Sequence, residues 1–291
     1  QAVSARSYAV TSMGHHSAYH FDLCNTTDCQ VYYGVNSVGA NTTLATELTA
    51  GQFAWYDGEI IQAFYHSSDG GATENVENVW TTVLPYLRGV IDPYEALVED
   101  QIPGYHWTKT YTGKELQTRM VNNGYTSCAE VADLQVTRTT PTGNVYSITV
   151  TDINGKSFTI SKYSVRTVLG ITSLRFTISG GNGSSSSGGD YSLAGGGTME
   201  NMAGAWVIGG DGTLSQVETD NVYAITGSGL EQVSAQTGMG TGSSGGSFVI
   251  SGTGNGHNLG MSQWGAYAMA LEGYTYEEIL KFYYTGIEIH T

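Results

Sequence analysis

Positive charge and long apolar runs are both scarce in this sequence of 291 residues. It has 11 Lys and Arg against 26 Asp and Glu, which gives a formal net charge of −15. Such a chain repels a phosphate backbone, so nucleic acid is not an expected partner. No apolar run approaches the roughly 18 residues that a membrane span needs, and no basic and apolar leader opens the chain. The sequence therefore predicts no membrane-spanning helix.

Charged residues make up only 13% of the chain, whereas glycine (40) and tyrosine (20) are abundant. This profile is more typical of an exported wall or surface protein than of a cytosolic enzyme. The opening stretch "QAVSARSYAVTSM" spaces its apolar residues as a helix does but has no capping residue, so Gln1 reads as the interior of a helix. We expect the natural protein to extend upstream and to be exported to the cell wall, to the extracellular space or to a membrane anchor carried by that upstream segment.

Two regions of mixed helix and strand pattern, 1–178 and 248–291, frame a segment of different composition, 179–247. This segment holds 19 of the 40 glycines and no Lys or Arg. Its "GGNGSSSSGG" opening is typical of a flexible linker, but 205–217 and 221–235 contain short alternating strands with glycine turns. We predict an inserted Gly/Ser-rich β unit.

The framing regions predict an α+β fold of mixed helices and antiparallel strands. Hairpins are expected to turn at Asp57-Gly58 and at Asn154-Gly155. Near the end, "SQWGAYAMALEG" reads as a helix stopped by Gly273, and a Thr-x-x-Glu capping box precedes a second helix in "YEEILKFYYTG". Two antiparallel helices are therefore expected to close the chain.

A loop near the start, "HHSAYHFDLCNTTDCQVYYG", contains Cys24 and Cys29 downstream of several histidines. Two thiolates and an imidazole supply three of the four tetrahedral ligands that zinc prefers. An exported protein would as readily join the two cysteines in a disulfide, so both alternatives stay open. Cys128 stands alone and is expected to be a buried small hydrophobe.

The stretch "FYHSSDGGATENVENVW" follows a predicted strand and is rich in polar side chains. One interpretation is a turn in which Ser, Asp and Gly satisfy one another's backbone groups. The other is the polar floor of a cleft, where a carboxylate and hydroxyl donors serve as acid/base or as groups that position a sugar. The residues concerned are His66, Ser67, Ser68, Thr73 and Glu74.

A glycine-rich loop, "GTGNGHNLGMSQWGAYAMA", leads into the predicted helix and lets backbone approach a ligand closely. It is no phosphate loop, because no Lys-Ser/Thr follows, and no serine-hydrolase elbow, because the second glycine is missing. His257, Ser262 and Gln263 are its candidate binding residues. The alternative is structural: Ser262 caps the helix and His257 is a turn residue.

These stretches, together with "QAVSARSYA", "FDLCNTTDCQVYYG" and the weaker "SVRTVLGITSLRF", make the sequence resemble the stage II sporulation protein D and amidase-enhancer family of exported peptidoglycan-active proteins. The likeness covers about 1–178 and 248–291 and implies a peptidoglycan-binding and catalytic domain built around a glycan-binding cleft. It implies a lytic transglycosylase, which cleaves between N-acetylmuramic acid and N-acetylglucosamine and leaves an anhydro-muramic end. One carboxyl protonates the leaving oxygen and then takes a proton from the C6 hydroxyl.

The resemblance also implies particular residues and partners. The family's catalytic glutamate falls a few residues before Gln1, so the resemblance implies no catalytic acid within these 291 residues. The family's Cys-Cys-His zinc loop implies Cys24 and Cys29 as ligands, with His16 or His20 as the third, and one zinc per chain. Partners would be glycan strands and an N-acetylmuramoyl-L-alanine amidase. The predicted glycan-binding residues are Arg6, Tyr8, His66, Ser67, Ser68, Thr73, Glu74, His257, Ser262 and Gln263. Two alternatives remain, a non-catalytic amidase enhancer that binds glycan and a structural surface component.

Overall fold

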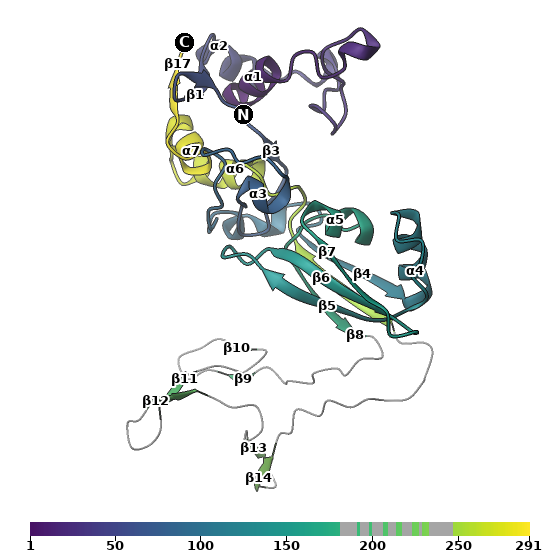
Figure 1. The fold of residues 1–291 in the computed structure, drawn as a ribbon. Coiled ribbons are helices and arrows are strands. Elements are labelled where there is room, and N and C mark those ends of the chain that lie inside the picture. Colours follow the sequence, from purple (N-terminus) through teal and green to yellow (C-terminus); the bar gives the residue numbers. More distant parts are fainter. Residues whose placement is uncertain are drawn as a thin grey trace.

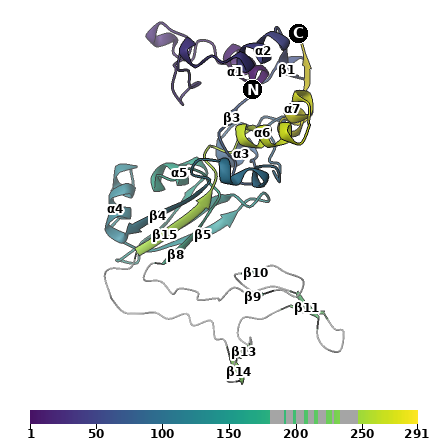
Figure 2. The ribbon, with the colours of Figure 1, turned by 180° about the vertical axis from the view of Figure 1, so that it is seen from behind.

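The structure, a computed structural model, describes residues 1–180 and 247–291 in full and, between them, only the backbones of short strands. Helices and antiparallel sheets alternate along the chain, which confirms the α+β prediction. The N- and C-termini lie at the same end of the molecule, and the larger sheets lie further from them (Figures 1 and 2). No helix among the described residues is both long and apolar enough to cross a membrane.

The end that carries the termini is built from the first and last parts of the chain. A three-stranded antiparallel sheet has the order β17-β1-β2, so the final strand pairs with the first. Asp57 and Gly58 have φ values of 52° and 80°, which give the tight turn predicted between β1 and β2. The elements here are α1 (Ala2–Thr11), α2 (Ala40–Leu48), β1 (Phe53–Tyr56), β2 (Glu59–Ile60) and β17 (Glu288–His290).

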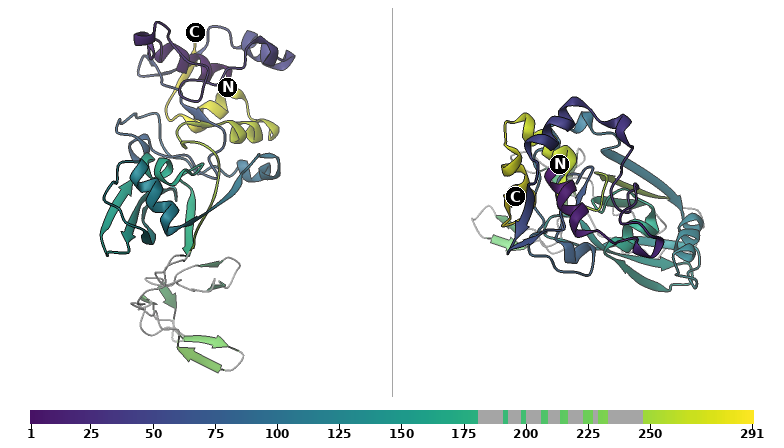
Figure 3. Two further views of the ribbon diagram at one scale, coloured as in Figure 1. Left: turned by 90° about the vertical axis from the view of Figure 1, so that its right-hand side faces the viewer. Right: turned by 90° about the horizontal axis from the view of Figure 1, so that it is seen from above.

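Between α1 and α2 the chain forms an arm, residues 12–39, most of which is exposed. Its only regular elements are the single turns η1 (Ser17–Tyr19) and η2 (Val35–Ser37). Large apolar side chains on the arm, such as Tyr33 at 81% exposed, remain uncovered. The arm projects beside α1, as the view from above makes clear (Figure 3).

Two antiparallel three-stranded sheets, ordered β4-β15-β8 and β5-β6-β7, form the other end. Gly155 (φ 78°) lies in the predicted turn between β6 and β7. Leu116 and Met120 on α4 and Leu169 on α5 are fully buried, so both helices contribute to the core. The elements are β4 (His106–Thr112), α4 (Gly113–Asn122), β5 (Val131–Thr139), β6 (Val145–Asp152), β7 (Ser157–Ser161), α5 (Tyr163–Leu169), β8 (Phe176–Gly180) and β15 (Ser247–Thr253).

The middle of the molecule contains the two polar loops that the sequence singled out, 66–74 and 252–260 (Figure 1). Short strands β3 and β16 pair in parallel, and the two closing helices follow. Ser262 caps α6 by accepting from the Gly265 amide, and Thr275 and Glu278 form the predicted capping box of α7. The elements are β3 (Tyr65–His66), α3 (Val76–Val79), η3 (Glu95–Leu97), η4 (Glu99–Gln101), β16 (Met261–Ser262), α6 (Gln263–Leu271) and α7 (Tyr276–Tyr283).

The predicted unit 179–247 lies largely outside the described residues. Antiparallel strand pairs occur in both segments where the sequence predicted them, β11 with β12 and β13 with β14. The strands are β9 (Tyr191–Ser192), β10 (Thr198–Met199), β11 (Trp206–Ile208), β12 (Leu214–Gln216), β13 (Tyr223–Thr226) and β14 (Gly229–Gln232).

Candidate functional site

The two polar loops predicted to face one groove, 66–74 and 252–260, lie against each other. Besides the β3-β16 ladder, an isolated bridge joins Ser68 to Asn255. Asn258 is left-handed (φ 63°), and its side-chain amide donates to the carbonyl oxygens of Asp69 (2.6 Å) and Ala72 (3.0 Å). The two loops therefore meet as predicted, and many of their polar groups form hydrogen bonds between the loops.

His66 and His257 come together where the loops meet, with ring centroids 5.2 Å apart. Nδ1 of His66 lies 3.2 Å from the carbonyl oxygen of Leu259, and Nδ1 of His257 accepts from the Leu259 amide at 3.1 Å. Desolvation by burial, followed by the charge of Arg166, lowers the pKa of His257 to about 4. Burial, followed by the charge of His257, also holds the pKa of His66 well below its usual value. Both imidazoles are therefore neutral at pH 7 and are not proton donors there.

Glu74 is 1% exposed and its carboxylate is fully engaged inside the protein. One oxygen accepts from the backbone amide of Asn75 and the side-chain amide of Asn78, both at 2.8 Å. The other accepts from the hydroxyls of Thr140 (2.6 Å) and Thr142 (2.7 Å) and from Asn144 at 3.1 Å. This network fixes the loop to the turn between β5 and β6 and leaves no oxygen for a ligand.

Several other predicted binding residues are likewise occupied by the fold. Ser68, Thr73 and Ser262 are 0% exposed, and His66 is 5% exposed. Ser67 is half-buried, and its carbonyl oxygen accepts from the Trp264 amide at 3.0 Å. These residues form the framework beneath the surface.

The two residues predicted on the opening helix also make structural contacts. Nη1 of Arg6 donates to the carbonyl oxygens of Thr49 and Gln52, both at 2.8 Å. Tyr8 is 8% exposed, and its ring meets that of Phe64 edge-on at 5.6 Å. Arg6 therefore ties α1 to the end of α2, and Tyr8 packs α1 against the segment before β3.

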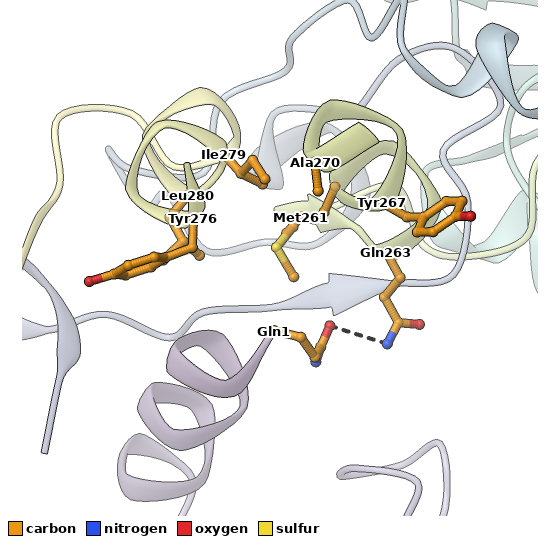
Figure 4. A pocket seen from close by; sticks show the side chains of 9 residues that line it. Gln1, Met261, Gln263, Tyr267, Ala270, Tyr276, Ile279 and Leu280 are labelled. Carbon is orange, nitrogen blue, oxygen red and sulfur yellow. Dashed lines mark hydrogen bonds between the residues drawn. The ribbon is translucent and has the colours of Figure 1, made fainter. Parts of the chain in front are cut away.

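An accessible pocket of about 290 Å³ lies between the start of α1 and the closing helices (Figure 4). Gln263 is the only predicted binding residue that lines it, and its amide donates to the side-chain oxygen of Gln1 at 3.2 Å. Tyr267 and Tyr276, 44% and 41% exposed, bring aromatic rings and hydroxyls to the rim. The lining residues are Gln1, Met261, Gln263, Ala266, Tyr267, Ala270, Tyr276, Ile279 and Leu280.

Sequence reasoning missed the two rim tyrosines. Tyr267 follows Gln263 by one helical turn, so the same face of α6 presents both, and this i to i+4 spacing was the available signal. Tyr276 opens α7 and becomes a neighbour only because the two helices pack together. An amide and two tyrosines around an apolar floor suit a ligand with both hydroxyls and a carbon ring face.

A second cluster lies in the exposed arm, at the predicted cysteine loop. Nε2 of His16 lies 3.1 Å from Asp28 Oδ2. This nitrogen atom is buried but makes no hydrogen bond. Ligand atoms of His15, His16, Asp28 and Cys29 all lie within 4.8 Å of one another. The group that the structure brings together thus contains His16 and Cys29 but also the unpredicted His15 and Asp28, and His20 is not in it.

The second cysteine of the loop, Cys24, lies beside this group. Its thiol is 3.2 Å from the hydroxyl of Thr26 and 3.9 Å from Asp28 Oδ2, and both loop cysteines are free thiols. Hydrogen bonds from Thr26 lower the pKa of Cys24 to about 6, so its thiolate is available at neutral pH. An orphaned imidazole nitrogen, two sulfurs and a carboxylate fit a tetrahedral zinc ion. The third cysteine, Cys128, is buried as predicted.

Comparison with known proteins shows that this chain is similar to several bacterial proteins. A family model described as "Stage II sporulation protein" matches residues 1–56. The amidase enhancer of Bacillus subtilis (strain 168) is 28% identical over 297 residues, which cover 98% of this chain and 37% of that protein. An uncharacterized protein of Brachyspira hyodysenteriae (strain ATCC 49526 / WA1) is 28% identical over 295 residues, 99% of this chain and 60% of its own length.

The stage II sporulation protein D of Bacillus subtilis (strain 168) is 27% identical over 247 residues, which cover 85% of this chain and 50% of that protein. The chain therefore spans between 37% and 60% of the length of these curated relatives.

Proposed function

Because the chain belongs to the family of the stage II sporulation protein D and the amidase enhancer, we propose that it acts on the bacterial cell wall and binds the glycan strands of peptidoglycan. The pocket between α1 and α6 supports this proposal best. The pocket presents the side-chain amide of Gln263 and the exposed rings of Tyr267 and Tyr276. Amide and phenol groups bind sugar hydroxyls, and aromatic rings pack against sugar ring faces.

The proposed reaction is lytic transglycosylase cleavage between N-acetylmuramic acid and N-acetylglucosamine. The acid that the resemblance implies belongs a few residues before Gln1, on a continuation of α1, and Gln1 lines the pocket. A helix rises about 1.5 Å per residue, so an acid about five positions earlier would lie roughly 7 to 8 Å along the axis from Gln1. Bound sugar and acid would then share one cleft.

In this proposal the residues of this chain bind and orient, and the upstream carboxyl moves the proton. His66 and His257 are neutral near pH 7, because burial lowers the pKa of both rings, so neither supplies the acid that protonates the leaving oxygen. Gln263 and the rim tyrosines hold the glycan so that the C6 hydroxyl of the muramic residue can attack its own anomeric carbon. No water is added, and an anhydro end results.

The test uses a protein that includes the helix upstream of Gln1, incubated with glycan strands from which stem peptides have been removed. Mass spectrometry should find products with anhydro-muramic ends. Changing the upstream glutamate to Gln should abolish them. Products with reducing ends, in which water has been added, would exclude the transglycosylase mechanism.

A second candidate function is a non-catalytic enhancer of a cell-wall amidase. The observation in its favour is that the relative named amidase enhancer aligns with 98% of this chain. This function predicts that the same upstream-extended protein binds glycan, leaves it intact, and raises the turnover of an N-acetylmuramoyl-L-alanine amidase. Anhydro products formed without amidase would favour the enzyme instead.

We also propose that the arm binds one zinc ion through Cys24, Cys29 and His16, with Asp28 as the fourth ligand. Such an ion supplies a structural crosslink and no reaction step. Gln30, next to Cys29, donates to the Ala5 carbonyl oxygen at 3.1 Å and accepts from the Tyr65 hydroxyl at 2.7 Å. The ion would therefore hold the arm against α1 and β3. Zinc and the composition together suit an exported wall protein, which is the location we propose.

A further inference from the structure

Three carboxyl groups lie together beneath the start of α6. Asp69 and Glu95 are 0% exposed and Asp92 is 3% exposed. One oxygen of each lies within 4.8 Å of the others. None of the ion pairs in residues 1–180 and 247–291 includes any of the three. Three buried carboxylates without a counter-ion would repel one another strongly, so the cluster needs either a cation or a proton.

Glu95 is already saturated by donors from the surrounding chain. Its Oε1 accepts from the Asp69 amide (2.8 Å) and from the Ser262 hydroxyl. Its Oε2 accepts from the Ser68 hydroxyl (2.7 Å) and from the Gly70 amide (3.0 Å). A carboxylate oxygen has two lone pairs, so Glu95 has none left for a cation. These four donors favour the ionised form of Glu95 and oppose the burial that raises its pKa.

Unlike Glu95, Asp92 and Asp69 are not saturated by donors from the surrounding chain. Asp92 Oδ1 accepts from the amides of Tyr94 (2.8 Å) and Glu95 (3.4 Å). Its Oδ2 accepts from the Tyr283 hydroxyl (2.6 Å) and keeps one lone pair. Asp69 accepts only from the Gly71 amide (2.7 Å), on Oδ1, and its buried Oδ2 has no partner. One carboxyl oxygen of Asp92 lies within 4.8 Å of one carboxyl oxygen of Asp69.

We propose that Asp69 and Asp92 share one proton and act as a pH-sensitive lock beneath α6. Asp69 is the neutral acid, and its Oδ2–H donates to the free lone pair of Asp92 Oδ2. This single proton satisfies the one orphaned oxygen of the cluster and removes one of three charges. A divalent cation fits less well, because Ca²⁺ and Mg²⁺ take six or more oxygen ligands and Glu95 has none to offer.

Burial and the neighbouring carboxylates favour the neutral acid, whereas the hydrogen bond from the Gly71 amide favours the ionised form of Asp69. Burial, then the charges of Glu95 and Asp92, raises the pKa of Asp69 well above its usual value. The remaining titratable neighbours are the phenols of Tyr283 on α7 and Tyr105 before β4, both with raised pKa values. From β16 and α6 come only the Ser262 hydroxyl and backbone.

The lock joins three segments that are distant in sequence. Asp69 follows β3, Asp92 precedes η3, and Asp92 accepts from Tyr283 near the end of α7. When Asp69 loses its proton, two adjacent buried charges push the turn after β3 away from η3. Ser262, held by Glu95, directly precedes Gln263 of the pocket. Alkaline pH should therefore loosen the pocket from below.

The direct test is a ¹³C NMR titration of protein labelled at the aspartate carboxyl carbons. At pH 6 an ordinary aspartate is about 99% ionised. We expect one aspartate signal to keep the chemical shift of a neutral acid at pH 6 and to lose it on further alkalinisation. The signal should be absent from Asp69→Asn and unchanged in the control Asp133→Asn. If every aspartate is ionised at pH 6, the proposal is overturned.

A stability comparison tests the lock independently of assignment. Asp69→Asn keeps a donor towards Asp92 and cannot ionise. As pH rises from 5 to 8, its urea midpoint should therefore increase relative to the midpoint of the unmodified protein. Identical pH curves for the two proteins would overturn the proposal. So would a melting temperature that Ca²⁺ or Mg²⁺ raises in the unmodified protein but not in Asp69→Asn, because that result assigns a cation. If Asp69→Asn does not fold, the NMR titration of the unmodified protein decides.

Discussion

The carboxylate of Glu74 accepts a 2.6 Å hydrogen bond from the hydroxyl of Thr140, which lies 66 positions later in the chain. This contact joins the loop after β3 to the turn between β5 and β6, and four further donors complete it. Glu74 thus connects the middle of the molecule to the end that contains the β5-β6-β7 sheet through buried hydrogen bonds.

Replacing Glu74 by Gln should destabilise the fold by about 1 to 3 kcal/mol, because the new amide N–H₂ faces donors and leaves them unsatisfied. Glu77→Gln is the matched control. Glu77 pairs with Arg88 at 2.7 Å at a partly exposed site, and its loss should cost less than about 1 kcal/mol. Urea unfolding measures both. A Glu74→Gln protein of normal stability that no longer binds glycan would instead make Glu74 a ligand contact.

Gly254→Ala should be more destabilising than Gly273→Ala. Both glycines have positive φ (83° and 92°), so each substitution carries the same backbone penalty of about 1 kcal/mol. A Cβ at Gly254 would lie 2.6 Å from the Gly70 amide nitrogen, whereas one at Gly273 meets nothing within 4 Å. The clash should add roughly 1 to 3 kcal/mol in thermal or urea unfolding. Equal costs would mean that the two loops do not touch.

Tyr267→Ala should weaken binding of stem-peptide-free glycan strands about tenfold, because loss of an aromatic contact with the sugar costs roughly 1 to 2 kcal/mol. Tyr33→Ala on the arm, where Tyr33 is 81% exposed, is the control and should leave the affinity unchanged. Titration calorimetry with both variants gives the comparison. Equal affinities in all three proteins would move the glycan site away from the pocket.

His16→Ala should lower the zinc content of the purified protein, whereas His20→Ala should not. His16 Nε2 lies in the ligand group with Asp28 and Cys29, and His20 lies outside it. Elemental analysis should find about one zinc per chain in the unmodified protein, and acid should release it, since the ligands must be deprotonated. A Cys24 to Cys29 disulfide with no metal would contradict this.

The stability of the protein should fall between about pH 6.5 and pH 4 because of His66 and His257. Their pKa values are lowered in the folded state, that of His257 to about 4. Below pH 6.5 the two histidines therefore bind protons in the unfolded chain but not in the folded chain. As the pH is lowered, the free energy of unfolding decreases by up to about 1.4 kcal/mol per pH unit for each histidine. His257→Gln should flatten the slope of urea midpoint against pH, and the exposed His106→Gln should not. An unchanged slope in His257→Gln would show that this ring titrates normally.

Local signals were predicted well because neighbouring residues decide them. The turns at Asp57-Gly58 and Asn154-Gly155 depend on residues that accept positive φ, and the Ser262 cap depends on one hydroxyl. The pairing of β17 with β1 was not predicted, because it joins residues more than 230 positions apart. Nothing in a three-residue strand specifies such a partner.

The site was predicted in part for the same reason. The shared polar character of the two loops predicted that they meet. It did not predict that their side chains are buried, because the sequence does not distinguish a serine or glutamate in a buried network from one in a cleft. Glu74 and Ser68 turned out to be framework residues in this structure. The accessible Tyr267 carried no motif, and only the packing of α6 beside α1 and α7 brings it to the pocket.

The ladder between β8 and β15 has a consequence for the segment that separates them. Gly180, at the end of β8, is the Cα partner of Phe248 in β15, so the chain leaves the sheet and returns to it at neighbouring positions. The two strands are therefore antiparallel neighbours, and residues 181–246 come between them in the sequence. The entropy of closing a loop grows only with the logarithm of its length, by about 0.6 kcal/mol per doubling. The length of chain between β8 and β15 therefore adds little to the free-energy cost of forming this ladder.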